Sequence, residues 1–175
     1  MRSSIKADAI VLKKGSLLNQ DSIITFLTAD YGRLRVYARG IKKITSRRLP
    51  HTQTGNYVKI LITKKDQNYY LVQSEIVSAF QKIKLNEYKR NCLYCMFFII
   101  DRLVPENQAD QDIFLVVKQF LIALSEKTTF TRLDMTEHLN LALGVLGYVS
   151  DSPTFESLRL AVEEIMQEKL PYFSI

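Results

Sequence analysis

The spacing of apolar residues changes near Lys84, from a period of two to a period of about 3.6. Before this point, five short runs rich in β-branched and aromatic residues alternate with turn signals, which predicts strands at 4–12, 21–28, 33–39, 56–63 and 68–77. After it, apolar residues recur at spacings of three and four, as on one face of a helix. We therefore predict an α+β protein, with a strand domain at residues 1–80 and a helical domain at residues 81–175.

Five strands within about 80 residues suit a small closed barrel, because closure removes the exposed edges of a sheet. The five-stranded OB-fold β-barrel is a compact solution of this kind, and it binds nucleic acid on its strand face and loops. An SH3-like barrel or an open sheet would produce much the same pattern. Periodicity alone does not choose among the three.

Four helices are predicted in the second half. Each has an apolar face and a recognisable stop or start: Pro105 ends the first, Asp110 caps the second, Gly147 ends the third, and Ser152 with Pro153 opens the fourth. The expected ranges are 85–104, 110–125, 131–147 and 154–170. Short connections between antiparallel helices predict an α-helical bundle.

The two halves of the chain also differ in net charge. Residues 1–84 hold 16 Lys or Arg against 5 Asp or Glu, a net +11, whereas residues 85–175 hold 8 against 13, a net −5. Residues 31–48, "YGRLRVYARGIKKITSRR", contain seven Lys or Arg and no acidic residue. A run of like charge is often only a solvated surface, but self-repulsion on this scale favours an anionic partner such as a polynucleotide.

Strand alternation places part of this basic run on one face. If residues 33–39 are extended, Leu34, Val36 and Ala38 point into a core. The opposite face then carries a row of cations interrupted by one aromatic ring, formed by Arg33, Arg35, Tyr37 and Arg39. Such spacing, roughly 6.6 Å between alternate residues, resembles the phosphate repeat of an extended single strand. Arginine would bind phosphate and tyrosine would stack on a base of any identity.

The loop that follows extends the basic surface. It contributes Lys42, Lys43, Arg47 and Arg48, with Thr45 and Ser46 as further hydrogen-bond donors to phosphate. Loop and strand face reinforce each other, so we predict nucleic-acid binding at these residues.

Several motifs in this order resemble the bacterial recombination mediator family RecO. "DAIVLKKG" is followed by "DSIITFLTADYGRLRVYARGIKK" and "SRR", and the likeness continues through "QSEIVSAF", "DRLVPENQADQDIFLVVKQFLIAL" and "LALGVLGYVSD". The residues that match the first motifs are Asp21, Thr28, Tyr31, Gly32, Ala38, Arg39, Gly40, Ser46 and Arg47. Many members of the family carry a cysteine-rich zinc module after the "LGY" segment, and this sequence has none there.

The resemblance implies a function as well as a fold. It implies binding of single- and double-stranded DNA, annealing of complementary strands, and loading of RecA recombinase with RecR as partner. It assigns DNA binding to Arg33, Arg35, Arg39, Lys42, Lys43, Arg47 and Arg48, whereas Tyr37 comes from the strand argument alone. It also implies binding of the C-terminal tail of single-stranded DNA-binding protein on the helical domain, where we place it at Phe114 and Lys118.

The sequence contains no recognisable motif for catalysis, nucleotide binding or metal binding, so we predict no enzyme, no cofactor and no metal site. Cys92 and Cys95 lie on an apolar helical face without a second ligand pair, which favours core packing over zinc. His51 and His138 form no recognisable nucleophile and base pair. The start lacks the apolar stretch of a secretory signal, and the run at 92–100 is too short to span a bilayer. We expect a soluble cytoplasmic protein.

Two alternatives share the basic strand. The first is an RNA-binding OB module that prefers contacts to the ribose 2′-hydroxyl. The second is an adaptor whose positive surface binds an acidic protein tail without touching nucleic acid.

Overall fold

The computed structural model describes residues 3–18, 20–43, 45–148 and 153–175. The contacts divide the chain into two compact units: Met1–Ala79 with Pro105–Gln111, and Phe80–Val104 with Asp112–Ile175. The segment Pro105–Gln111 therefore groups with the strands, although the predicted domain limits assigned it to the helical domain. Those limits, 1–80 and 81–175, stay a prediction.

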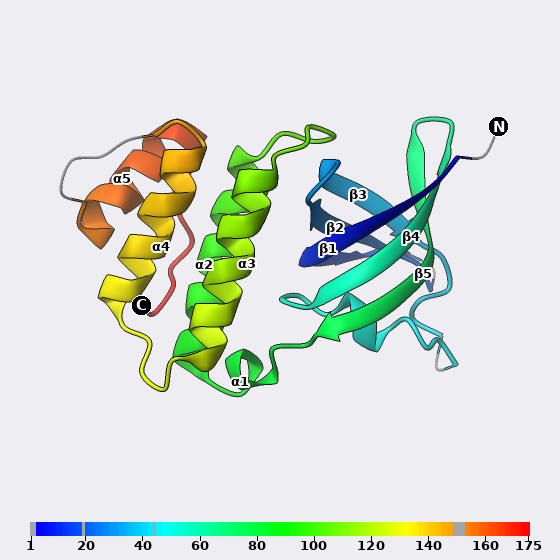
Figure 1. Cartoon of the computed structure of the whole chain (residues 1–175), viewed down its shortest axis with the longest axis horizontal. Helices are drawn as coiled ribbons and strands as arrows, with labels where there is room; N and C mark the ends of the chain where they lie inside the picture. Colours follow the sequence, from blue (N-terminus) through cyan, green and yellow to red (C-terminus); the bar gives the residue numbers. More distant parts are fainter. Residues whose placement is uncertain (1–2, 19, 44, 149–152) are drawn as a thin grey trace. The chain divides into compact units, whose positions relative to one another are not determined.

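The first unit is a closed barrel of five strands (Figure 1). The strands are β1 (Ser3–Ser16), β2 (Ser22–Thr28), β3 (Gly32–Ala38), β4 (Tyr57–Lys65) and β5 (Asn68–Ser78). They follow the order β1-β2-β3-β5-β4, and β1 pairs with both β2 and β4. A short parallel pairing of β3 with β5 closes the ring. This is the OB-fold arrangement, so the predicted fold class is confirmed.

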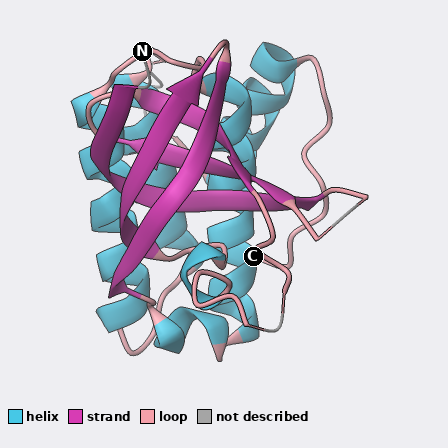
Figure 2. Ribbon diagram, turned by 90° about the vertical axis from the view of Figure 1, so that its right-hand side faces the viewer, coloured by secondary structure: helices cyan, strands magenta, loops and turns pink. Residues whose placement is uncertain are grey.

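Alternation along the strands builds the barrel core. Leu34, Val36 and Ala38 of β3 are fully buried, as predicted from the sequence. They pack in one cluster with alternate residues of the other strands, namely Ala7, Ala9, Val11, Ile24, Phe26, Val58, Ile60, Ile62 and Leu71. The long strand β1 has a register shift between Val11 and Lys13, which lets it curve from its pairing with β4 to its pairing with β2. Figure 2 shows the strands crossing one another around this core.

The second unit is built from α-helices. They are α1 (Gln81–Lys84), α2 (Glu87–Leu103), α3 (Gln111–Glu126), α4 (Arg132–Val145) and α5 (Phe155–Met166). The single-turn helix α1 was not predicted. The other four match the predicted bundle, although α5 ends at Met166, before the expected Leu170. The residue that follows it, Gln167, lies in the left-handed region at φ 52°. Of the predicted start signal of α5, Ser152 lies outside the described residues.

Local side chains define the helix starts. The Asn86 side chain accepts a hydrogen bond from the backbone N–H of Lys89 at the start of α2. Thr131 and Asp134 form a reciprocal capping box at the start of α4, and Thr154 with Ser157 forms another at α5. Gly147, at φ 88°, follows the end of α4, as predicted.

The interior of the helical unit holds both cysteines. Cys92 and Cys95 are fully buried on α2, and burial raises the pKa of each thiol to about 12. Contacts between rings join neighbouring helices: Phe120 of α3 lies 5.6 Å from His138 of α4, centroid to centroid. These cysteines are core residues, as the sequence pattern indicated.

In the described part of the chain, no helix is both long enough and apolar enough to cross a bilayer.

Candidate nucleic-acid interface

The outer row of β3, defined as Arg33, Arg35, Tyr37 and Arg39, lies on one side of the strand, opposite the buried Leu34, Val36 and Ala38. Exposure alternates along the row. Arg33 and Tyr37 are half-buried, whereas Arg35 and Arg39 are exposed. The alternation predicted from the sequence is therefore confirmed, and the strand presents its cations outward.

The first member of this row, Arg33, has an acidic partner. Its guanidinium lies 3.6 Å from Glu106, and its side chain is only 16% exposed. The segment Pro105–Gln111 runs beside the start of β3, where the Asn107 N–H donates to the Arg33 carbonyl at 3.0 Å. Arg33 thus has much of its charge compensated within the protein, and the open part of the row begins at Arg35.

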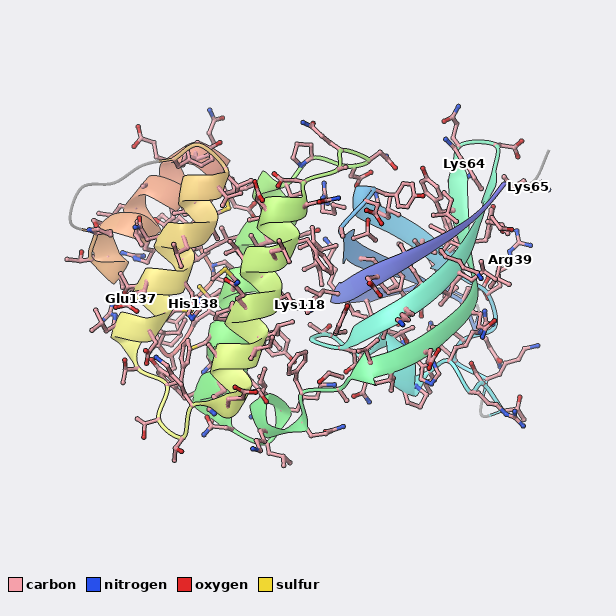
Figure 3. All side chains as sticks on the ribbon, in the orientation of Figure 1. Arg39, Lys64, Lys65, Lys118, Glu137 and His138 are labelled. Atoms are coloured by element: carbon pink, nitrogen blue, oxygen red, sulfur yellow. The ribbon has the colours of Figure 1, made fainter. Side chains whose placement is uncertain are left out.

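An aromatic and cationic cluster occupies the other end of the row. The Tyr37 and Tyr70 rings lie 5.6 Å apart between centroids, because the parallel pairing of β3 with β5 places these two residues opposite each other. The Arg39 guanidinium carbon lies 4.6 Å from the centre of the Tyr70 ring. Together with Thr63 and Lys65 these side chains line a hollow of about 210 Å³. Figure 3 shows Arg39 and Lys65 on the barrel.

Two basic side chains of the loop after β3 attach it to the barrel through hydrogen bonds to backbone carbonyl groups. The Arg48 guanidinium donates to the Leu71 carbonyl of β5 at 2.8 Å and to the Arg39 carbonyl at 2.9 Å. It therefore bridges β3 and β5. The Lys42 ammonium donates to the Leu17 carbonyl at 2.9 Å in the turn between β1 and β2. Both residues were predicted to bind DNA, and both have structural hydrogen bonds.

Other basic side chains of this surface are more open. Lys43 and Arg47 are exposed on the loop, as is Arg35 on the strand. Among the described residues, the structure gives these three side chains no hydrogen bond or ion pair. Lys14 of β1 adds to the positive field: burial, and then the nearby charge of Lys42, lower the pKa of its ammonium group. A bound polyanion would relieve this repulsion.

The residues predicted to bind a protein tail lie on α3. Phe114 is only 4% exposed, so its ring contributes to packing and little of it is open to a partner. Lys118 is half-buried on the same helix. The exposed apolar side chains beside Lys118 are Leu115 and Ile122.

Sequence reasoning missed Tyr70 and Lys65. The tyrosine pair "NYY" in a predicted strand was a usable signal, since alternation requires one of the two rings to face outward. The pairing of β5 with β3, which brings Tyr70 beside Tyr37, was not visible in the sequence.

Known proteins resemble this chain over nearly its whole length. Residues 1–80 match the family model described as recombination protein O N terminal. The chain is 26% identical to DNA repair protein RecO of Caldanaerobacter subterraneus subsp. tengcongensis over 170 residues, which cover 97% of this chain and 66% of the relative. It is 28% identical to DNA repair protein RecO of Thermodesulfovibrio yellowstonii over 164 residues, covering 92% of this chain and 63% of the relative. The chain is thus similar to RecO proteins over nearly all of its own length, and it spans about two thirds of the length of these relatives.

Proposed function

We propose that this chain takes part in DNA repair by binding DNA strands on the outer face of its barrel. The observation that carries the proposal is the exposed cationic and aromatic surface formed by Arg35, Tyr37 and Arg39, with Tyr70 beside it. Arginine binds phosphate and the aromatic rings stack on bases, a combination that suits binding of many sequences. The names of the curated relatives support a repair role.

The proposed mechanism of annealing follows from charge. Two complementary strands repel each other through their phosphates, and a basic surface that binds both would lower this repulsion. The exposed side chains of Lys43 and Arg47, on the loop after β3, add further cations to this surface. No covalent step is needed, so the proposal requires no catalytic residue.

A more specific role would involve partner proteins as well as this basic surface. We propose that the protein helps load RecA with RecR, on strands coated by single-stranded DNA-binding protein. Because Phe114 is buried, the proposed site for the acidic tail of that protein shifts to the face of α3 that carries Leu115, Lys118 and Ile122. An apolar tail end would contact the two aliphatic residues, and its carboxylates would face the ammonium group.

The test of strand binding is a pair of charge-reversal variants. Arg35→Glu with Arg39→Glu should weaken binding of a single-stranded oligonucleotide at least about tenfold at about 50 mM salt, as measured by fluorescence anisotropy. The matched control is Lys6→Glu with Lys59→Glu, which makes the same charge change on exposed residues of β1 and β4. Equal affinity losses in both variants would contradict a specific role for the β3 face.

A competition experiment separates the alternatives. Unlabelled DNA, RNA of the same sequence and an acidic tail peptide should compete with labelled DNA in that order. Stronger competition by RNA would favour the RNA-binding module. Displacement by the peptide alone, without measurable DNA affinity, would favour the adaptor.

A further inference from the structure

A second hollow lies on the other side of Tyr37 from the one that contains Arg39. Its volume is about 140 Å³, and its polar lining comes from three separate parts of the chain. Arg35 and Tyr37 belong to β3. Gln67 lies in the turn before β5, and Asn68 is the first residue of β5. Glu106 and Asn107 belong to the segment after α2. Tyr37 borders both hollows.

The lining of this hollow suits a base better than a phosphate. Glu106 places a carboxylate there, and its ion pair with Arg33 at 3.6 Å holds it in position. A phosphate that entered would meet this negative charge, although Arg35 also lines the hollow. The amide side chains of Gln67 and Asn68 can donate and accept hydrogen bonds, as the edge of an unpaired base requires.

We infer that this hollow binds the edge of one unpaired base that carries an exocyclic amino group, such as cytosine. This inference rests on the proposed strand binding and specifies what the same surface recognises. The amino group donates to the Glu106 carboxylate, a pairing that proteins use to recognise cytosine. In a duplex the complementary guanine covers most of this edge and leaves only the second amino hydrogen in the major groove, so only an unpaired base can present its whole edge to the hollow.

Neighbouring groups support such an arrangement. Arg35 and Arg39 flank Tyr37 on the exposed side of β3 and would hold the phosphates on either side of the bound nucleotide. Tyr37 is half-buried between the two hollows, where its ring can stack on the base. The ion pair of Arg33 with Glu106 then has a function: it positions the carboxylate.

The test compares two oligonucleotides that differ only at the base edge. Oligo-dC and oligo-dU of equal length have similar rings, but cytosine carries an amino group where uracil carries a carbonyl oxygen. Anisotropy titrations at neutral pH should give oligo-dC an affinity about three- to tenfold higher. The variant Glu106→Gln should reduce this ratio to about one, because the amide can donate to the uracil oxygen.

The matched control is Glu75→Gln, which removes an exposed carboxylate of β5 that lies outside this hollow. It should raise both affinities slightly and leave their ratio unchanged. Equal binding of the two oligonucleotides by the unmodified protein, or a ratio that Glu106→Gln leaves unchanged, would overturn the base-edge site while strand binding stood. Failure of both oligonucleotides to bind would overturn the proposed function as well.

Discussion

Asp21 Oδ1 accepts a hydrogen bond from the backbone N–H of Gly40 at 2.7 Å. The contact joins the residue before β2 to the turn after β3, where Gly40 has a φ of 60°. Two residues of the family-like motifs are therefore explained by structure: they fix the end of the strand that carries Tyr37 and Arg39.

Removing the Asp21 carboxylate should destabilise the barrel. Hydrogen bonds to charged groups contribute about 1.5–3 kcal/mol, so Asp21→Ala should lower the free energy of unfolding by about that amount. Asp21→Asn keeps an acceptor oxygen and should cost less than half as much. Urea unfolding followed by circular dichroism measures both changes. Equal losses in the two variants would show that the charge itself, and not the acceptor, matters.

The other end of the β2–β3 hairpin depends on Gly32. Its φ is 66°, and a Cβ at this position would lie 1.8 Å from the Gln108 carbonyl oxygen. Gly32→Ala should therefore cost about 4 kcal/mol or more, because the backbone of Pro105–Gln111 must move. Gly147→Ala is the matched control, since φ is also positive there but no atom of the described residues lies within 4 Å. It should cost only about 1–2 kcal/mol in thermal or urea unfolding. Similar losses would contradict the close approach.

Arg48 and Arg47 are neighbours with different expected roles. The Arg48 guanidinium bridges carbonyl groups of Leu71 and Arg39, whereas Arg47 is exposed. Arg48→Gln should lower the free energy of unfolding by about 1–2 kcal/mol, and Arg47→Gln should leave it unchanged within about 0.5 kcal/mol. Both variants lose one positive charge, so a difference between them in unfolding experiments isolates the bridge. Equal stability would assign Arg48 to ligand binding alone.

The strands, their inward faces and the outward row of cations could be predicted from the sequence, because they depend on local alternation. The contacts that neutralise or cover residues of this row come from segments that are distant in the sequence. Tyr70 reaches Tyr37 only through the parallel pairing of β3 with β5, and Glu106 reaches Arg33 from a segment after α2. No periodicity reports such pairings. For the same reason the sequence could not separate Arg48, a bridging residue, from the exposed Arg47.

The free energy of unfolding should depend on pH in the acidic range, because Asp134 at the start of α4 has a lowered pKa. Ion pairing with Lys127, with added hydrogen bonds from Thr131, lowers the pKa of Asp134 to about 2 from an ordinary value of 3.8. The folded state thus binds this proton more weakly than the unfolded state. The resulting stabilisation is complete above about pH 4 and is lost as pH falls towards 2.

The corresponding variant is Asp134→Asn, which cannot ionise. Between pH 4 and pH 2 the free energy of unfolding of the unmodified protein should fall more steeply than that of the variant, in urea titrations at each pH. Glu137→Gln, on an exposed residue of the same helix, is the control. Parallel pH profiles for the unmodified protein and Asp134→Asn would refute the assignment.

Tyr70 should distinguish single strands from duplexes. Its ring centroid lies 5.6 Å from that of Tyr37 and 4.6 Å from the Arg39 guanidinium carbon, so it supports the flat groups on which a base would stack. Stacking contributes about 1–3 kcal/mol per base, and Tyr70→Leu should therefore weaken single-strand binding at least about fivefold. Duplex affinity, which depends on phosphate contacts, should change less than twofold. Tyr94→Leu, at an exposed tyrosine of α2, should change neither affinity in the same anisotropy titrations. A parallel loss for single strands and duplexes would mean that Tyr70 acts only by positioning Arg39 for phosphate.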